Sequence, residues 1–350
     1  MVESECLLRE YDDASLETMR ESFRRDGFVV FHNAIESSIA STLRIRLDEV
    51  LDGRYSRGYP PDKIPSLRTP SETTTTTATA TTKNGKEKTK DGGAGGGGSR
   101  VVQVVNVHKS DIDFRRLATS SDIGRVVSIL GGWERGARLA QDQVWHKPPG
   151  APPLVFHRDS PYFMFEPNDV ITVWIALDDM DDEVGPLEYV RGSHLWGDGR
   201  FGSCRNFFGK RKNKNNNNNY TDLLYSAARR EGITDPESTL AVVSLAGMRT
   251  GGMSVHNGRT WHGSGRNASS VRSRRGYGLH FVPAEVRFTA EMRFSKLWRG
   301  YVPDDDDDVV DIAKIDIPEE DFPLTYDPRW QGVEGGACGS PVPLPPHDIG

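Results

Sequence analysis

His157 and Asp159 stand near the start of an apolar stretch, residues 154–177, with the sequence LVFHRDSPYFMFEPNDVITVWIAL. Side chains at positions i and i+2 of an extended chain point to the same side, so this imidazole and this carboxylate can bind one ion. A single HxD pair is a weak signal, because a surface His beside a turn Asp has the same spacing. The pair predicts a metal centre only if a further ligand can be found.

A second His-bearing segment, residues 254–267 (SVHNGRTWHGSGRN), supplies two candidates for that ligand. His262 lies on what reads as a strand leading into a loop, between two glycines, and we favour it. His256 is the alternative, and we interpret it as a structural residue or one that supports the ligands. Two His and one carboxylate leave three metal positions open, which suits ferrous iron that must bind a cosubstrate and oxygen. Zinc is the competing interpretation, but structural zinc often uses thiolates, and no Cys lies near either segment.

Three arginines follow His262 in the segment VRSRRGYGLHF: Arg272, Arg274 and Arg275. A guanidinium is a natural bidentate partner for a ligand carboxylate inside a protein. On an alternating strand Arg274 shares one face with His280 and with two glycines that leave room for a small ligand. This pattern selects Arg274, whereas a solvated basic loop is the alternative for any one of the three.

The elements that must position these residues are mostly strands. The chain opens with a predicted helix at 13–25, a strand at 28–32 and a helix at 39–50. Beyond Arg100 one helix is predicted at 122–130, among eight short apolar or alternating segments that read as strands: 101–107, 139–145, 154–156, 170–177, 187–190, 240–245, 253–256 and 276–282. The fold class is therefore mostly β with flanking helices (α+β), a sandwich or barrel. A doubly wound sheet is excluded, because it needs helices between successive strands.

Two segments of biased composition interrupt this pattern. Residues 71–99 (SETTTTTATATTKNGKEKTKDGGAGGGGS) and the Asn-rich residues 210–219 cannot bury enough apolar area to offset the entropy of ordering them. We expect the first to be a disordered insertion and the second a loop insertion within one domain that spans residues 1–350. The acidic run at 304–308 is interpreted in the same way, as a loop expansion.

Charge and cysteine content exclude several classes of protein. The 350 residues carry a formal net charge of −6, so no basic field is available for nucleic acid. Three widely separated cysteines argue against a disulfide framework and for a reducing compartment. The acidic N-terminus does not resemble a secretory signal, the final HDIG is not a peroxisomal signal, and no long apolar window occurs. We expect a cytoplasmic protein with a small-molecule substrate and neither nucleic acid nor membrane as partner, as a monomer or weak homodimer.

Three ordered motifs together resemble a known family. HRD at 157–159, GPLEYVRGSH at 185–194 and HGSGRN at 262–267, with an Arg shortly after, are similar to the phytanoyl-CoA dioxygenase (PhyH) family of non-haem Fe(II)- and 2-oxoglutarate-dependent oxygenases. DGFVVFHNAI at 26–35 and QDQVWHKPPG at 141–150 also match, so the resemblance covers most of the chain. It implies a double-stranded β-helix core, that is, a cupin-like jelly roll.

The resemblance also implies roles for particular residues. The iron ligands would be His157, Asp159 and His262, and Arg274 would bind the far carboxylate of 2-oxoglutarate. The cosubstrate pocket would further include Ser264, Trp174, Lys147 and Gln141. The family commonly has its Arg eleven residues after the distal His, where this chain has Ser273. Aligning the following His280 and Phe281 restores Arg274 with a one-residue insertion, and Arg272 and Arg275 stay open alternatives.

The reaction that the resemblance implies is hydroxylation of a small molecule, with Fe(II), 2-oxoglutarate and O2 consumed in a cycle that releases succinate and CO2. Halogenating relatives replace the carboxylate ligand by a small residue, so Asp159 favours hydroxylation. Pro161, Tyr162 and Phe163 are candidates to line the substrate cavity, although aromatic residues more often belong to a core. Two alternatives are a catalytically silent jelly-roll binding or scaffold protein and a zinc-dependent metalloprotein. Nothing in the sequence marks a site for the phosphates of coenzyme A.

Overall fold

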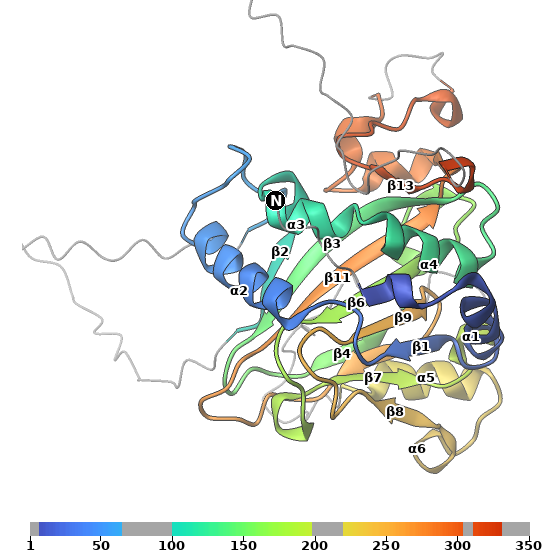
Figure 1. Ribbon diagram of the computed structural model, residues 1–350. Helices are drawn as coiled ribbons and strands as arrows, with labels where there is room; N and C mark the ends of the chain where they lie inside the picture. The colour runs from blue at the N-terminus through green and yellow to red at the C-terminus, as the bar shows by residue number, and fades with distance from the viewer. Residues whose placement is uncertain (1–6, 65–99, 198–219, 304–310, 331–350) are drawn as a thin grey trace, which may run out of the picture.

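The structure is a computed structural model that describes residues 7–64, 100–197, 220–303 and 311–330 (Figure 1). The two biased segments, residues 71–99 and 210–219, lie outside the described residues, as does the acidic run at 304–308. No helix in the described ranges combines the length and the apolar run that crossing a bilayer requires.

Two antiparallel sheets form the centre of the molecule. The larger one has seven strands in the order β1-β9-β6-β11-β3-β13, with β2 paired to β3, and the smaller one has the order β4-β10-β7-β8. The strands of the larger sheet are β1 (Phe28–Phe31), β2 (Val102–Val105), β3 (Ala137–Lys147), β6 (Ile171–Ala176), β9 (Met253–Asn257), β11 (Arg274–Pro283) and β13 (Leu324–Tyr326). Those of the smaller sheet are β4 (Leu154–His157), β7 (Leu187–Val190), β8 (Val242–Ser244) and β10 (His262–Ser264). This confirms the predicted mostly β class with a jelly-roll core.

Each of the eight predicted strand segments overlaps an observed strand. Three short strands were not indicated by the sequence: β13, β5 (Phe165–Glu166) and β12 (Arg287–Phe288). The last two pair with each other. Two or three residues are too few to show an alternating pattern.

The helices cover the outer face of the larger sheet. The predicted N-terminal and central helices are present as α1 (Asp13–Asp26), α2 (Ser37–Leu51) and α4 (Ser121–Gly131). Figure 1 shows α2, α3 (Ile112–Ala118) and α4 lying across the strands. The prediction of a single helix beyond Arg100 was wrong, because α3, α5 (Asp222–Arg230) and α6 (Pro236–Thr239) also form. Helices of four to nine residues give only one or two turns in which to read an apolar stripe.

The end of α1 is fixed by a glycine. Asp12 caps the first turn by accepting a hydrogen bond from the Ser15 N–H at 2.8 Å. Gly27 ends the helix with φ at 86°, and a Cβ there would lie 2.6 Å from Nδ1 of His194. The chain then turns directly into β1.

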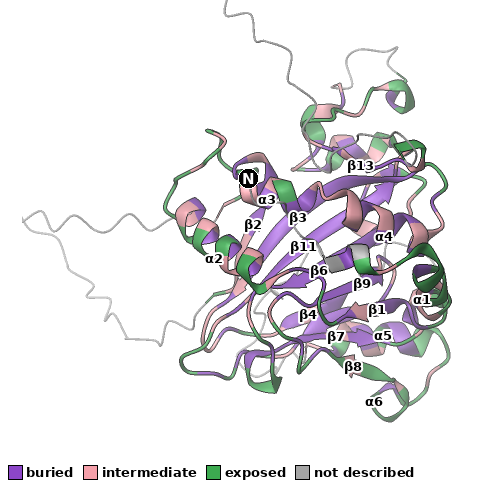
Figure 2. Ribbon diagram, viewed as in Figure 1, coloured by how far each residue is buried: buried purple, intermediate pink, exposed green. Residues whose placement is uncertain are grey.

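Alternation along the strands of the larger sheet separates an apolar face from a polar one. On β11, Tyr277, Leu279 and Phe281 are buried in the core beneath the helices, and complete burial of such a side chain stabilises the fold by about 1.5–3 kcal/mol. Figure 2 shows the central strands buried along their length, with the exposed positions on the helices and loops. The positions between these apolar residues, including Arg274 and His280, turn to the space between the two sheets. The polar face of the larger sheet therefore meets the smaller sheet.

Candidate metal centre

Strand pairing brings together the two His residues predicted as ligands. His157 is the last residue of β4 and His262 is the first of β10, and they stand opposite each other in the antiparallel register. Their ring centroids are 4.1 Å apart. Asp159 lies two residues beyond the end of β4, so its side chain returns to the side that His157 occupies.

The three side chains point their donor atoms at a common space. Nε2 of His157 and Nε2 of His262 each lie 3.7 Å from Oδ1 of Asp159. These distances exceed a hydrogen bond. One donor atom from each of the three residues lies within 4.8 Å of the other two. The group therefore has the spacing of ligands around an ion.

Each His is held in the tautomer that a metal requires. Nδ1–H of His157 donates to the carbonyl of Val155 at 2.9 Å, and Nδ1–H of His262 donates to the carbonyl of Thr260 at 3.0 Å. The lone pair of each Nε2 therefore faces Asp159, which is the usual arrangement of metal-ligating His. Two imidazole nitrogens and one buried carboxylate fit a divalent cation such as Fe(II).

Electrostatics keeps these groups in their ligating forms. Burial, followed by the nearby His262, lowers the pKa of His157 to about 3. Burial alone would raise the pKa of Asp159, but the neighbouring His262 and the hydrogen bond from His256 hold that pKa well below its usual value. At neutral pH His157 is neutral and Asp159 is ionised.

His256 lies on the other oxygen of the same carboxylate. Its Nε2 is 3.1 Å from Oδ2 of Asp159, and its Nδ1 is 3.1 Å from the hydroxyl of Tyr189. Burial, followed by His262, lowers the pKa of His256 to about 4, so its ring is neutral. This placement supports its interpretation as a residue that supports the ligands.

A second polar group, formed by two buried basic side chains, lies beside the same interlayer space. Arg274 is 1% exposed, and its Nη2 donates to Oγ of Ser264 at 3.3 Å. Lys147 is 0% exposed, and its Nζ donates to the same Oγ at 2.8 Å and to the carbonyl of Gly265. The two cations are opposite each other in the pairing of β11 with β3. Among the described residues neither of them forms an ion pair with a carboxylate.

Both basic groups lose proton affinity because their burial outweighs the attraction of the nearest carboxylates, Glu188 for Lys147 and Asp178 for Arg274. Burial, followed by the charge of Arg274, lowers the pKa of Lys147 to about 6. Burial lowers the pKa of Arg274 to about 10. An anion bound between them would oppose both effects. The pair therefore has the properties of a carboxylate site.

The other two arginines are engaged at the surface. Nη2 of Arg272 contacts the carboxylates of Asp181 at 2.5 Å and Glu183 at 2.8 Å. Arg275 donates two side-chain N–H groups to Asp178, both at 2.8 Å. Arg274 is thus the member of this cluster that faces the space between the sheets, as the alternation predicted.

Trp174 forms one wall of this space. The guanidinium of Arg274 lies 5.4 Å from the centre of its ring system. Gly276 makes room for the ring, because a Cβ at that position would lie 1.9 Å from Cζ2 of Trp174. The metal group, Trp174, Ser264 and Arg274 all line one cavity. Gln141 and Lys147 are buried but are not among the residues lining it, whereas Gln143, two positions from Gln141 along β3, is. Lys147 lies behind this lining and contacts it through Ser264.

Sequence reasoning overlooked Thr172 and Tyr189. Thr172 donates to Oδ2 of Asp159 at 2.7 Å, and Tyr189 contacts His256. A signal for Thr172 was present, because it is the polar member of the apolar run that forms β6, on the same side as Trp174. Tyr189 carried no comparable signal.

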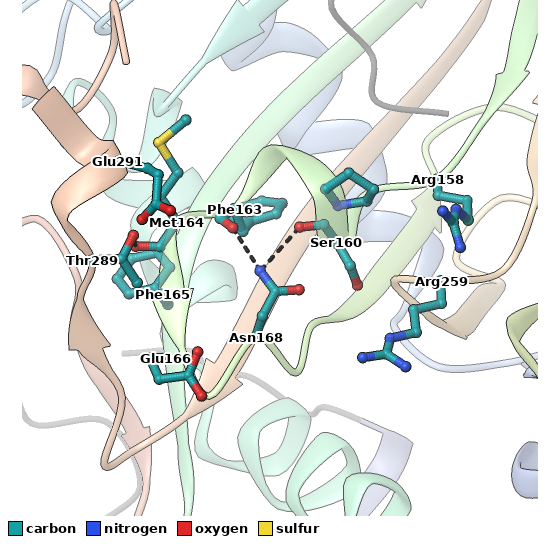
Figure 3. A pocket seen from close by; sticks show the side chains of 11 residues that line it. Arg158, Ser160, Phe163, Met164, Phe165, Glu166, Asn168, Arg259, Thr289 and Glu291 are labelled. Atoms are coloured by element: carbon teal, nitrogen blue, oxygen red, sulfur yellow. Dashed lines mark hydrogen bonds between the residues drawn. The ribbon is translucent and has the colours of Figure 1, made fainter. Parts of the chain in front are cut away.

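A larger cavity of about 330 Å³ adjoins the metal loop (Figure 3). Ser160, which follows Asp159, lines it together with Pro161 and Phe163, two of the predicted cavity residues. The ring of Phe163 lies 4.9 Å from that of His280, which belongs to the wall of the first cavity. Figure 3 shows Arg158 and Arg259 at one side, and Glu166 and Glu291 at the other.

The third predicted residue, Tyr162, is not in this wall. Its ring packs 5.1 Å from that of Trp298, next to an aromatic core that the C-terminal region contributes. Tyr162 thus takes the core role that aromatic residues more often have.

Two antiparallel sheets that enclose a His-Asp-His group define a jelly-roll protein with a buried group that could hold a metal ion. The chain belongs to the phytanoyl-CoA dioxygenase (PhyH) family, whose sequence profile matches residues 23–276. This confirms the resemblance seen in the motifs.

The comparisons with individual proteins agree with this family. The chain is 28% identical over 138 residues to a probable alpha-ketoglutarate-dependent hypophosphite dioxygenase of Stutzerimonas stutzeri, a match that covers 39% of this chain and 42% of that protein. Less than half of that relative is therefore spanned.

The fold is similar to two solved structures from nogalamycin biosynthesis. The non-haem alpha-ketoglutarate-dependent epimerase SnoN matches with a TM-score of 0.59 and 19% identity, over 90% of this chain and all (100%) of that one. The carbocyclase SnoK matches with a TM-score of 0.60 and 17% identity, over 91% and 98%. At this identity the similarity concerns the fold alone.

Proposed function

We propose that the protein is an Fe(II)- and 2-oxoglutarate-dependent oxygenase that hydroxylates a small molecule, with release of succinate and CO2. The observation that carries the proposal is the presence of two complementary groups in one buried space. One is a neutral-His and carboxylate set suited to Fe(II), and the other is a cation pair without a described carboxylate partner. A dicarboxylate that chelates the metal at one end and binds the cations at the other would satisfy both.

His157, Asp159 and His262 would hold the iron. When bound, the metal supplies the redox chemistry in which 2-oxoglutarate loses CO2 and one oxygen atom of O2 enters a C–H bond of the substrate, the other remaining in succinate. Asp159 provides the single negative charge of the ligand set. Its ionised state at neutral pH follows from its contacts with His262 and His256.

Arg274, Lys147 and Ser264 would bind the far carboxylate of the cosubstrate. The guanidinium can donate two parallel N–H bonds, and the Lys147 amine, on the other side of the Ser264 hydroxyl, would add a positive charge once it takes up a proton. Trp174, whose ring lies 5.4 Å from the guanidinium, would close this end and exclude water. Exclusion of water strengthens each of these interactions, because the local dielectric is low.

We also propose that the 330 Å³ cavity of Figure 3 receives the substrate. It borders the loop that carries Asp159, and its lining joins arginine and glutamate side chains to an apolar surface from Phe163, Met164 and Phe165. Such a lining suits a small molecule that bears charged groups beside an apolar portion.

The test of the proposed activity is anaerobic addition of 2-oxoglutarate to the Fe(II)-loaded full chain. We expect a metal-to-ligand charge-transfer band, and succinate formation after oxygen is admitted. A chain that binds Fe(II) but shows neither the band nor succinate would contradict the proposal, as would one that isolates with zinc and gains no activity after exchange to iron.

The substrate cavity is tested with metabolite extract and mass spectrometry. We expect products that gain one oxygen atom, and we expect Arg259→Glu to lose them while it keeps slow succinate formation without substrate. Arg229→Glu, a charge reversal on the exposed side of α5, is the control and should retain the products. Equal product yield from the Arg259 variant would place the substrate elsewhere.

A further inference from the structure

The inner face of the larger sheet carries a row of polar side chains that crosses neighbouring strands. The row runs from β2 through β3, β11 and β6 to β9, and it ends on both sides of Asp159. Every link in it is a hydrogen bond between side chains. Its members, outside the ligand set, are Gln103, Gln143, His280, Thr172 and His256. Tyr189, on β7 of the smaller sheet, contacts the His256 end of the row.

The direction of the first links is set by a residue that can only donate. Nζ of Lys63, at the surface, donates to Oε1 of Gln103 at 3.2 Å. The amide nitrogen of Gln103 is then turned inward, and it donates to Oε1 of Gln143 at 2.6 Å. The amide of Gln141 points its nitrogen at the same oxygen, at 3.5 Å. The orientation of the Gln143 amide is therefore fixed, with its nitrogen toward β11.

The remaining hydrogen bonds run in the same direction and end at the carboxylate of Asp159, which can only accept. Nε2 of Gln143 lies 2.9 Å from Nε2 of His280, so this ring nitrogen must be the acceptor. Nδ1 of His280 then bears the proton, and it donates to Oγ1 of Thr172 at 2.9 Å. The Thr172 hydroxyl therefore donates its proton to Oδ2 of Asp159. An ionised carboxylate can only accept hydrogen bonds, so the chain ends there.

A shorter chain reaches the same oxygen from the opposite side. Nε2–H of His256 donates to Oδ2 of Asp159, so Nδ1 of the neutral ring accepts from the hydroxyl of Tyr189. The Tyr189 oxygen in turn accepts from the hydroxyl of Ser254, 2.8 Å away. Both chains thus end with a donor on Oδ2, and both leave Oδ1 facing His157 and His262.

We infer that these two converging chains are positioning devices that fix the Asp159 carboxylate with one oxygen toward the metal ligands and the other held by the protein. Thr172 and His280 form one positioning arm, and His256 and Tyr189 form the other. A carboxylate free to rotate could present both oxygens to an ion and occupy a further position on it. The two arms therefore preserve the open positions that a cosubstrate and oxygen require. This inference rests on the proposed metal centre.

The first test measures metal binding alone, by titrating Co(II) into the full chain. Thr172→Val removes the donor to Asp159 and the acceptor for His280 at nearly constant volume. We expect its Co(II) affinity to fall by about 10- to 100-fold. Thr172→Ser keeps the hydroxyl and should restore the affinity to within about threefold, a rescue that a purely steric role would not give.

A matched control separates this effect from the loss of a buried hydrogen bond in general. Thr325 is buried on β13, and its Oγ1 donates to the carbonyl of Ala137 at 2.9 Å. Thr325→Val should lower the melting temperature and leave Co(II) affinity unchanged. Wild-type affinity in Thr172→Val, or equal losses in the Val and Ser variants, would overturn the inference.

The second test reads the tautomer of His280 directly, in the wild-type chain. The wild-type chain is labelled with ¹⁵N in its imidazoles and measured by NMR, both metal-free and loaded with Zn(II). The inward direction of the hydrogen bonds requires the His280 proton to be on Nδ1 in both samples. The resonance is identified by its loss in His280→Gln. A proton on Nε2 would show that the hydrogen bonds run in the opposite direction. It would refute the role of Thr172 and His280 as a positioning arm. Neither test uses 2-oxoglutarate. Failure of that cosubstrate to bind would therefore contradict the proposed function but would leave the inference about the two arms to be decided by these tests.

Discussion

At the scale of single residues, His262 and His256, two of the buried His residues near Asp159, have different positions and should differ in effect. His262 faces Oδ1 beside His157, whereas His256 donates to Oδ2. We expect His262→Ala to abolish turnover and metal binding, because loss of one of three ligands removes both affinity and geometry.

His256→Ala provides the comparison for this prediction. It should reduce metal affinity but leave measurable turnover, since all three ligands remain. Metal titration and succinate formation measured on both variants decide the assignment. An inactive His256→Ala beside an active His262→Ala would exchange their roles.

Arg274 is predicted to dominate the binding of 2-oxoglutarate. Arg274→Lys keeps the charge but loses the planar fork, and the loss of a buried charge-assisted partner should weaken binding by roughly 2–5 kcal/mol, or more than tenfold. Arg272→Lys and Arg275→Lys alter ion pairs near the surface, which contribute about 0–1 kcal/mol, so binding should change less than threefold. Anaerobic titration of the charge-transfer band measures the 2-oxoglutarate affinity of all three variants. If Arg272→Lys or Arg275→Lys lost the most affinity, that arginine would be the one that binds the far carboxylate.

Lys147 should couple cosubstrate binding to proton uptake. Its pKa of about 6 leaves the amine neutral in the free protein at about pH 8, while the unfolded chain, with an ordinary lysine, is protonated. The folded state thus binds fewer protons, and the contribution of Lys147 to stability rises with pH between the folded and the unfolded pKa. A carboxylate bound beside the amine raises its pKa again.

Calorimetry checks this coupling. Titrating 2-oxoglutarate at about pH 8, in buffers of different ionisation enthalpy, should show uptake of up to about one proton per site. Lys147→Met should bind more weakly and without that uptake. Buffer-independent heats in the wild type would mean that the amine is already charged before the cosubstrate arrives.

At the scale of the elements, two glycines on β11 offer a matched pair of substitutions. A Cβ at position 276 would lie 1.9 Å from the Trp174 ring, whereas at position 278 the nearest atom is 3.6 Å away. Gly276→Ala must displace a packed indole in the middle of the sheet, and overpacking of this kind costs about 1–3 kcal/mol. Gly278→Ala should change the free energy of unfolding by less than about 1 kcal/mol. Denaturant unfolding of both variants measures the difference, and equal stabilities would show that Trp174 moves freely.

The elements also show how far the sequence predicts this structure. Alternation along β11 correctly predicted that Arg274 and His280 share a face, because polar and small residues alternate there with large apolar ones. The same reasoning failed for Thr172, because β6 is buried on both faces and its apolar run hides the alternation. The candidate ligands could be selected from residue type and motif order, but the hydrogen bonds around Asp159 depend on strand register, which no local pattern determines.

At the scale of the whole molecule, the insertion at residues 71–99 should be dispensable. A tract of Thr, Lys and Gly supplies little apolar surface, and the entropy of closing a loop grows only slowly with its length. Replacing it with a short Gly-Ser linker should leave the melting temperature and Fe(II) affinity nearly unchanged. A loss of several degrees together with turnover would show that the tract contributes to the folded site.

The pairing of β4 with β10 has a consequence for the stability of the protein. His157 and His262 are far apart in the chain and meet only when these two strands pair across the smaller sheet. An unfolded chain therefore holds no preformed ligand set, so a metal ion binds the native state selectively. By mass action, free metal at about 100 times its dissociation constant adds about 2.7 kcal/mol to the free energy of unfolding. An ion bound there would act as a removable cross-link between distant parts of the sequence, and the supply of iron would change the stability of the fold as well as its chemistry.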